Sequence, residues 1–149
     1  MPSPTMIDPR GPRFGAWVTT VVLSAVLLTG SGWLLAGQAA VFAVGALAGL
    51  RFAPYGLLYR HLVRPLLGPP TELEDETPPR FAQGVGLAFA LAGTAGYLTG
   101  VTAVAVLATA AALAAAFLNA AFGLCLGCEM YLILLRLRSR RSTHKGAPA

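Results

Sequence analysis

Residues 101–135 read VTAVAVLATAAALAAAFLNAAFGLCLGCEMYLILL and contain a single charged side chain, that of Glu129. An α-helix needs about 20 apolar residues to cross the hydrocarbon core of a membrane, so this run is too long for one straight crossing. Gly123 interrupts the run where one crossing would be complete. We therefore expect a membrane-spanning helix over residues 101–123, then a shorter segment, residues 124–136, along the inner membrane surface.

Three further apolar runs precede this one, over residues 14–29, 33–52 and 81–98. Short breaks at Gly30–Gly32 and Thr99–Gly100 separate the first run from the second and the third from the fourth. The pattern predicts an all-α integral membrane protein with four transmembrane helices arranged as two tandem hairpins. It forms one domain over residues 1–136, followed by a basic cytoplasmic tail over residues 137–149.

The composition supports a membrane environment. Of the 149 residues, 56% are hydrophobic and 11% are charged, whereas soluble domains carry about 25% charged residues. The chain lacks the polar surface that would cover a water-soluble globule, so its first partner is the lipid bilayer. Its net charge of +5 comes mainly from arginines at the edges of the apolar runs, so we expect no nucleic-acid binding.

Positive charge also predicts the orientation. Arginines and a lysine cluster before the first helix, between the second and third, and after the last, whereas both short breaks have none: Arg10, Arg13, Arg60, Arg64, Arg80, Arg136, Arg138, Arg140, Arg141 and Lys145. Loops rich in Lys and Arg stay in the cytoplasm. We expect a multi-pass protein of the inner (plasma) membrane with both termini cytoplasmic, and an acidic loop over residues 71–79 that is a solvated linker or a patch for a basic partner.

The two halves of the chain resemble each other at an offset of 67 residues. Pro12-Arg13-Phe14 aligns with Pro79-Arg80-Phe81, and Tyr55-Gly56-Leu57 aligns with Phe122-Gly123-Leu124. Two spans per half predict a pseudo-two-fold axis along the membrane normal. The alternative is that two apolar hairpins align by composition alone.

The candidate chemistry lies in the pair Cys125 and Cys128. A two-residue gap brings two thiols within disulfide reach, and the position at the inner end of the fourth helix favours a reversible dithiol over a structural bridge in a reducing cytosol. Inert thiols and a metal site are the alternatives. Two thiolates are half of a tetrahedral zinc site, which His61 and Glu129 could complete, but no spacing demands it, so no metal or cofactor is predicted.

Arg51 is the charged residue nearest the inner end of the second helix. If helices two and four pack together, its guanidinium could approach the cysteines and stabilise a thiolate. The alternative is that it reaches the lipid headgroups. Gln38 in the second helix and Asn119 in the fourth are weaker candidates, and interhelical hydrogen bonds explain them best.

Three motifs resemble a known family. Ile7-Asp8-Pro9-Arg10-Gly11-Pro12-Arg13-Phe14, Arg51-Phe52-Ala53-Pro54-Tyr55-Gly56 and Cys125-Leu126-Gly127-Cys128-Glu129 are together similar to the small bacterial membrane proteins called domain of unknown function 4395. The resemblance covers the chain up to about Arg136 and carries no catalytic residue. It implies an association with thioredoxin-like and rhodanese-like sulfurtransferase proteins, near which members are often encoded.

Three functions remain open. The first is a membrane dithiol protein that exchanges electrons or sulfane sulfur with a cytosolic thioredoxin-like or rhodanese-like partner. The second is a transporter of a small sulfur species with thiols at its inner mouth, which would need more polar residues at the midplane unless a homo-oligomer builds the path. The third is a structural or assembly subunit with incidental thiols.

Overall fold

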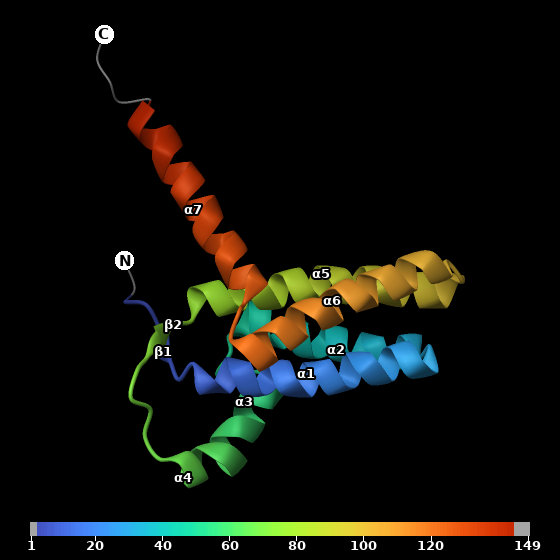
Figure 1. The fold of residues 1–149 in the computed structure, drawn as a ribbon, viewed down its shortest axis with the longest axis horizontal. Coiled ribbons are helices and arrows are strands. Elements are labelled where there is room, and N and C mark those ends of the chain that lie inside the picture. Colours follow the sequence, from blue (N-terminus) through green and yellow to red (C-terminus); the bar gives the residue numbers. More distant parts are fainter. Residues whose placement is uncertain (1–2, 145–149) are drawn as a thin grey trace.

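Five long helical stretches make up most of the computed structural model, which describes residues 3–144 (Figure 1). The helices are α1 (Arg10–Thr29), α2 (Gly32–Ala43), α5 (Thr77–Thr99), α6 (Thr102–Phe122) and α7 (Leu126–His144). A π-helical turn, η1 (Val44–Ala48), continues α2 without a break.

Left-handed glycines make the two tight turns that the sequence predicts. Gly30 after α1 has φ 65° and Gly100 after α5 has φ 79°, a region of backbone space that glycine enters without steric cost. The side chain of Ser31 then caps α2 by accepting the N–H of Leu34 over 3.2 Å. Both turns lie at one end of the bundle, and the two ends of the described chain lie toward the other (Figure 1).

The bundle is held by contacts both between and within the hairpins. α1 packs on α6, and α2 packs on both α5 and α1, while α5 packs on α6. The buried core is formed by Leu23, Val26, Leu35, Ala39, Phe42, Ala90 and Ala112.

Three of these helices are long and apolar enough to cross a membrane: α1, α5 and α6. The helix formed by α2 and η1, Gly32–Ala48, is apolar but shorter. The predicted all-α membrane character is therefore confirmed at the level of three candidate spans among residues 3–144.

The second predicted helix ends earlier than the sequence suggests. Gly49, with φ 108°, stops the helix at Ala48 rather than at residue 52. After a short link, Pro54 starts a separate helical segment made of α3 (Pro54–Leu58), η2 (Tyr59–Val63) and α4 (Arg64–Leu67). Proline suits this first helical position because its missing N–H would be unpaired there in any case.

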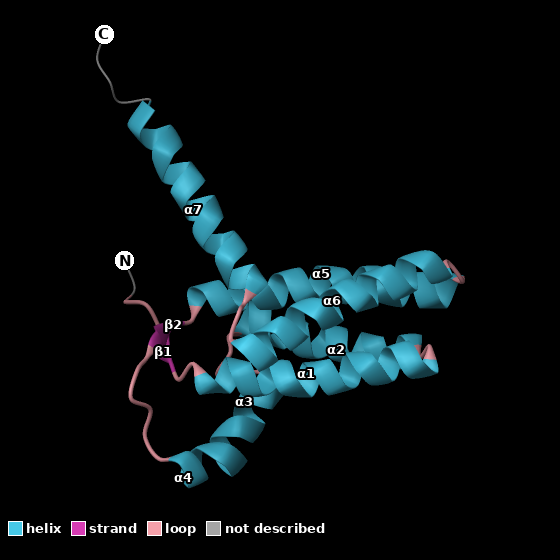
Figure 2. Cartoon of the chain, in the orientation of Figure 1, coloured by secondary structure: helices cyan, strands magenta, loops and turns pink. Residues whose placement is uncertain are grey.

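Outside the bundle, two short strands pair the segment before α1 with the segment before α5 (Figure 2). β1 (Met6–Ile7) pairs antiparallel with β2 (Glu74–Asp75), with Met6 opposite Asp75 and Ile7 opposite Glu74. The acidic loop is therefore only partly a free linker, and Glu76 at its end is 5% exposed.

The segment after the bundle is one continuous helix. α7 runs from Leu126 through the part of the chain predicted as a basic tail, up to His144, and projects away from the bundle (Figure 1). The remainder of that tail, residues 145–149, lies outside the described residues.

The offset of 67 residues holds only where the hairpins begin. α1 and α5 start 67 residues apart, but Gly30 and Gly100 are 70 apart because α5 is longer than α1. Gly56 lies within α3, whereas its sequence counterpart Gly123 ends α6, so the second pair of landmarks is not structurally equivalent.

Candidate functional site

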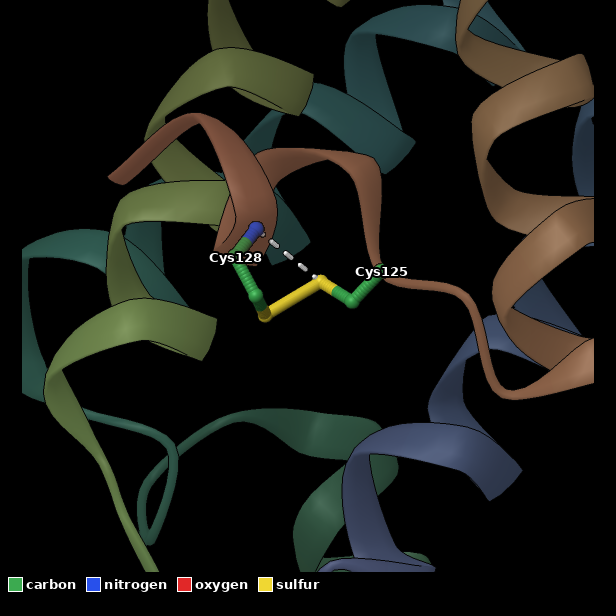
Figure 3. Close-up of a disulfide and its surroundings, with 2 residues drawn as sticks. All are labelled: Cys125 and Cys128. Atoms are coloured by element: carbon green, nitrogen blue, oxygen red, sulfur yellow. Dashed lines mark hydrogen bonds between the residues drawn. A yellow bond between two sulfur atoms is a disulfide. The ribbon is translucent and has the colours of Figure 1, made fainter. Parts of the chain in front are cut away.

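The sharp turn between α6 and α7 carries the two cysteines. Gly123, left-handed with φ 69°, ends α6, and its N–H donates to the carbonyl of Asn119 over 3.0 Å. A short link follows, so that Cys125 immediately precedes α7 and Cys128 lies in its first turn. The two side chains form a disulfide with their Cα atoms 5.2 Å apart (Figure 3), which is the proximity that the spacing predicts.

Cys125 takes the capping position of α7. Its Sγ accepts the backbone N–H of Cys128 over 3.3 Å (Figure 3), and its carbonyl accepts the N–H of Glu129 over 3.0 Å. Serine, threonine and aspartate oxygens fill the same role at other helix starts. A negative charge on this sulfur would be stabilised by the N–H and by the positive end of the helix dipole.

The cysteine turn rests directly on α5. A Cβ atom placed on Gly127 would lie 2.6 Å from the Cα of Ala82, so no larger residue fits between the cysteines without movement. The rings of Phe81 and Tyr131, with centroids 5.6 Å apart, hold the next turn of α7 against the same helix.

A cavity of about 590 Å³ opens beside the cysteines, between α1, α5, α6 and the start of α7. Small side chains form much of its wall, together with two phenylalanine rings and three uncharged polar groups. Its lining includes Thr19, Phe42, Ala82, Gln83, Gly86, Phe89, Ala111, Ala112, Ala115, Ala116, Asn119, Cys125 and Cys128. Arg10, Arg13 and Glu74 line it as well.

The structure does not bring Arg51 to this cavity. Arg51 lies exposed in the link between η1 and α3, with its Cζ 4.7 Å from the centre of the Phe52 ring. It lines a second cavity, of about 390 Å³, together with Arg60 and Arg64. The role of thiolate stabiliser that the sequence suggests for Arg51 stays a prediction, and the arginines that share a cavity with the cysteines are those at the start of α1.

Arg13 is the arginine that sequence reasoning missed. Its Nε donates to the carbonyl of Ala120 over 3.1 Å and its Nη2 to that of Ala121 over 3.3 Å, in the last turn of α6. The guanidinium therefore caps the helix that leads to Cys125. The repeated Pro-Arg-Phe motif was the sequence signal for this capping role. Arg80, in the second copy of the motif, donates in the same way to Ala46 and Leu47 at the end of η1.

The polar residues of the spans have different surroundings. Gln38 is fully buried; its amide donates to the hydroxyl of Thr19 over 3.4 Å and accepts the hydroxyl of Tyr55 over 2.6 Å. Asn119 and Gln83 line the large cavity, and their side chains make no hydrogen bond to any of residues 3–144. Gln83 had not been singled out from the sequence.

Two carboxylates fix the polar end of the bundle. Asp8 accepts hydrogen bonds from Arg10 and, over 3.0 Å, from the hydroxyl of Tyr59. Burial alone would raise the pKa of Asp8, but these hydrogen bonds outweigh it and lower that pKa below its ordinary value. Glu76 accepts the N–H of Leu50 over 2.8 Å at the break after η1.

No cluster among residues 3–144 brings together three His, Cys, Asp or Glu side chains in a way that could hold a metal ion. His61 lies within η2 and Glu129 is exposed on the first turn of α7. Nothing in the described part of the chain completes a thiolate site around the cysteine pair.

Comparison with known proteins places this arrangement in a family. The family model described as a domain of unknown function (DUF4395) matches residues 7–136, from β1 to the middle of α7. The chain belongs to the DUF4395 family. The match covers the turn of Cys125 and Cys128 as well as both Pro-Arg-Phe motifs. No curated protein and no solved structure matches the chain.

Proposed function

We propose that this DUF4395 protein is a membrane-embedded dithiol protein that exchanges electrons or sulfane sulfur with a cytosolic thioredoxin-like or rhodanese-like partner. The observation that carries the proposal is the position of Cys125, whose Sγ accepts the N–H of Cys128 at the start of α7. A thiolate is the reactive form of cysteine, and helix N-termini favour it. Both cysteines are half-buried beside a cavity rather than enclosed in the core.

The geometry assigns different roles to the two thiols. Cys125, as a thiolate, attacks a sulfur of the partner's disulfide and forms a mixed disulfide, while the partner's other sulfur leaves as a thiolate. Cys128 then attacks the Sγ of Cys125, closes the intramolecular disulfide and releases the reduced partner. With a persulfide donor, Cys125 instead attacks the outer, sulfane sulfur and keeps it as a persulfide, while the donor leaves as a thiolate.

The proposed membrane arrangement has four spans in two hairpins. The fourth span would be Gly32–Ala48, which is near the lower end of the length that a crossing needs. The reciprocal contacts of Arg13 with the end of α6 and of Arg80 with the end of η1 support a pseudo-two-fold relation between the hairpins. Arginines gather at the end of the bundle opposite the two tight turns. We therefore propose that the protein lies in the inner (plasma) membrane with this end facing the cytoplasm.

The test compares Cys128→Ser with Cys125→Ser in the full-length protein purified in detergent. We expect Cys128→Ser, which keeps Cys125, to react with iodoacetamide about tenfold faster at neutral pH than Cys125→Ser does, because only Cys125 is stabilised by the helix start. Cys128→Ser should also accumulate a mixed disulfide with an oxidised thioredoxin-like protein.

Thiol trapping of the wild-type protein in graded redox buffers completes this test. A pair that opens and closes reversibly supports the dithiol function, and a stable persulfide on Cys125, identified by mass, would select the sulfane-sulfur form. Equal reactivity of the two variants, or a pair that never exchanges with a thiol partner, would leave the structural-subunit alternative.

A further inference from the structure

The large cavity reaches from the cysteine turn deep into the membrane part of the bundle. Its wall on α6 extends from Gly123 back to Ala111, which is about 18 Å along the helix axis. Its volume of about 590 Å³ falls in the range of sites for small organic ligands. Ala111 and Phe89 line the cavity and are also exposed, at a level where α5 and α6 are apolar.

Besides the charged Arg10, Arg13 and Glu74, the lining combines apolar walls with two free amides. The rings of Phe42 and Phe89 and several alanines and glycines form the walls. Asn119 and Gln83 bring N–H donors that no group among residues 3–144 occupies, in contrast to Gln38, whose amide is bonded on both sides. The cavity therefore fits a largely apolar molecule that carries carbonyl oxygens.

The chemistry of the cysteine pair beside the cavity narrows the class of ligand further. Closing a disulfide from two thiols releases two electrons and two protons, which a second molecule must accept. An electron acceptor that reaches this cavity through the bilayer, past the apolar surfaces of α5 and α6, must dissolve in lipid. We infer that the cavity beside Cys125 and Cys128 binds the ring of a lipid-soluble quinone, which takes the electrons of the reduced cysteine pair.

This inference rests on the proposed dithiol function and extends it to a complete electron path. From the Cys125 thiolate and the Cys128 thiol, one S–S bond forms and one S–H bond breaks. The two electrons pass to the quinone, whose two oxygens take up the proton of Cys128 and one proton from water. The products are the disulfide and a quinol. The thiol exchange described above, running in the reverse direction with a reduced dithiol partner, restores the cysteine pair, and the partner becomes the disulfide.

The experiment uses reduced full-length protein in detergent and a short-chain benzoquinone that is substituted at every ring carbon, which prevents direct addition of thiols to the ring. Quinol formation is followed by ultraviolet absorbance and disulfide formation by thiol trapping. We expect one quinol per cysteine pair, with a rate that saturates as the quinone concentration rises. Cys128→Ser, which cannot close the disulfide, should form none.

Four variants on α6 test the site itself. Ala115 lines the cavity, whereas its neighbour Ala114 is exposed on the outside of the helix. Ala115→Phe should fill the cavity and lower kcat/KM for the quinone about tenfold or more, while Ala114→Phe, the same change on the outer face, should not. Ala115→Ser, which stays small, should retain the wild-type rate, and Asn119→Leu should raise KM more than it lowers kcat.

The outcomes separate this inference from the function on which it rests. A wild-type protein that exchanges with a thioredoxin-like protein but forms no quinol would overturn the quinone site and leave the dithiol function standing. The quinone site would also be overturned if quinol formed without saturation and at equal rates in Ala115→Phe and Ala114→Phe. Thiols that react with neither molecule would remove both proposals.

Discussion

Gly127, between the two cysteines, decides how closely the cysteine turn approaches α5. Any side chain at this position would meet the backbone of Ala82, so the start of α7 would have to move away from the helix that supports it. Cys125 would then lose part of the support that holds its Sγ near the N–H of Cys128. The absence of a side chain at Gly127 thus sets the geometry of Cys125 and Cys128.

Gly127→Ala should therefore destabilise the protein by about 1–3 kcal/mol, the usual cost of overpacking. It should also slow disulfide closure, because the thiols are displaced. Gly84→Ala on α5 is the matched control: it has no neighbouring atom within 4 Å, and we expect it to stabilise the helix by about 0.4–1 kcal/mol. Apparent unfolding temperatures in detergent, combined with the rate of disulfide closure, check both. Equal effects of the two substitutions would contradict the contact with Ala82.

Asp8 should make stability depend on pH in the acid range. Its pKa in the folded protein is lowered from the ordinary value of 3.8, so its ionised form contributes stability above that value. The contribution is lost as the pH falls through the folded pKa, when the bonds from Arg10 and Tyr59 lose their charged acceptor. Asp8→Asn should lower the unfolding temperature at neutral pH and flatten the decline below about pH 4. Glu72→Gln, at an exposed position, should leave the profile unchanged.

At the scale of the elements, the two Pro-Arg-Phe motifs act as reciprocal helix caps. Arg13 at the start of one hairpin binds the carbonyls that end α6, and Arg80 at the start of the other binds those that end η1. Arginine near a helix C-terminus pairs with its free carbonyls and with the negative end of the dipole. Each hairpin thus secures the end of the last helix of the other.

Arg80→Met should remove one of these caps while keeping the apolar part of the side chain. We expect a loss of about 1–2 kcal/mol, since the hydrogen bonds to Ala46 and Leu47 involve a charged donor that is partly exposed. Arg136→Met on α7 is the control, because Arg136 is exposed away from any helix end, and should change stability by less than about 0.5 kcal/mol. Unfolding midpoints in detergent measure both. A loss as large in Arg136→Met would refute the capping role.

The local sequence predicts the helix ends that are set by a glycine at the end itself. The ends of α1, α5 and α6 follow from glycines in the left-handed region, and the predicted bounds differ from the structure by a few residues. η1 also ends at a glycine, Gly49, but the link that follows is held by Glu76, which accepts the N–H of Leu50 from 26 residues away. No periodicity within either segment reveals that contact.

The same distinction applies to the candidate site. Spacing alone was sufficient to bring Cys125 and Cys128 together. The neighbours of the pair depend on how α1, α5 and α6 cross, which explains why Arg13 and Gln83 were missed and why Arg51 lies in the other cavity. Arg51 lies in the link after η1, and η1 packs on α5.

For the whole molecule, the two ends of the bundle differ in character. The end with the turns contains the packed core of Leu23, Val26 and Leu35, whereas the opposite end holds the arginines, both cavities and the cysteine turn. A transporter would have to open that core, and the buried Gln38 near it is already bonded to Thr19 and Tyr55. The asymmetry favours a site that is reached from one side of the membrane and from the lipid.

Labelling of introduced cysteines tests which side that is, in a background where Cys125 and Cys128 are serine. Thr99→Cys lies exposed at the α5–α6 turn and Ser142→Cys lies exposed near the end of α7. Ser31 is less suitable because its side chain caps α2. Since arginines are retained in the cytoplasm, an impermeant maleimide should label only Thr99→Cys in intact cells and both variants after permeabilisation. Labelling of Ser142→Cys alone in intact cells would invert the molecule and exclude a cytosolic partner for the cysteine pair. Labelling of both variants in intact cells would place both sites outside. The chain would then cross the membrane an even number of times between them. This would be the case if α7 crossed the bilayer as well as α6.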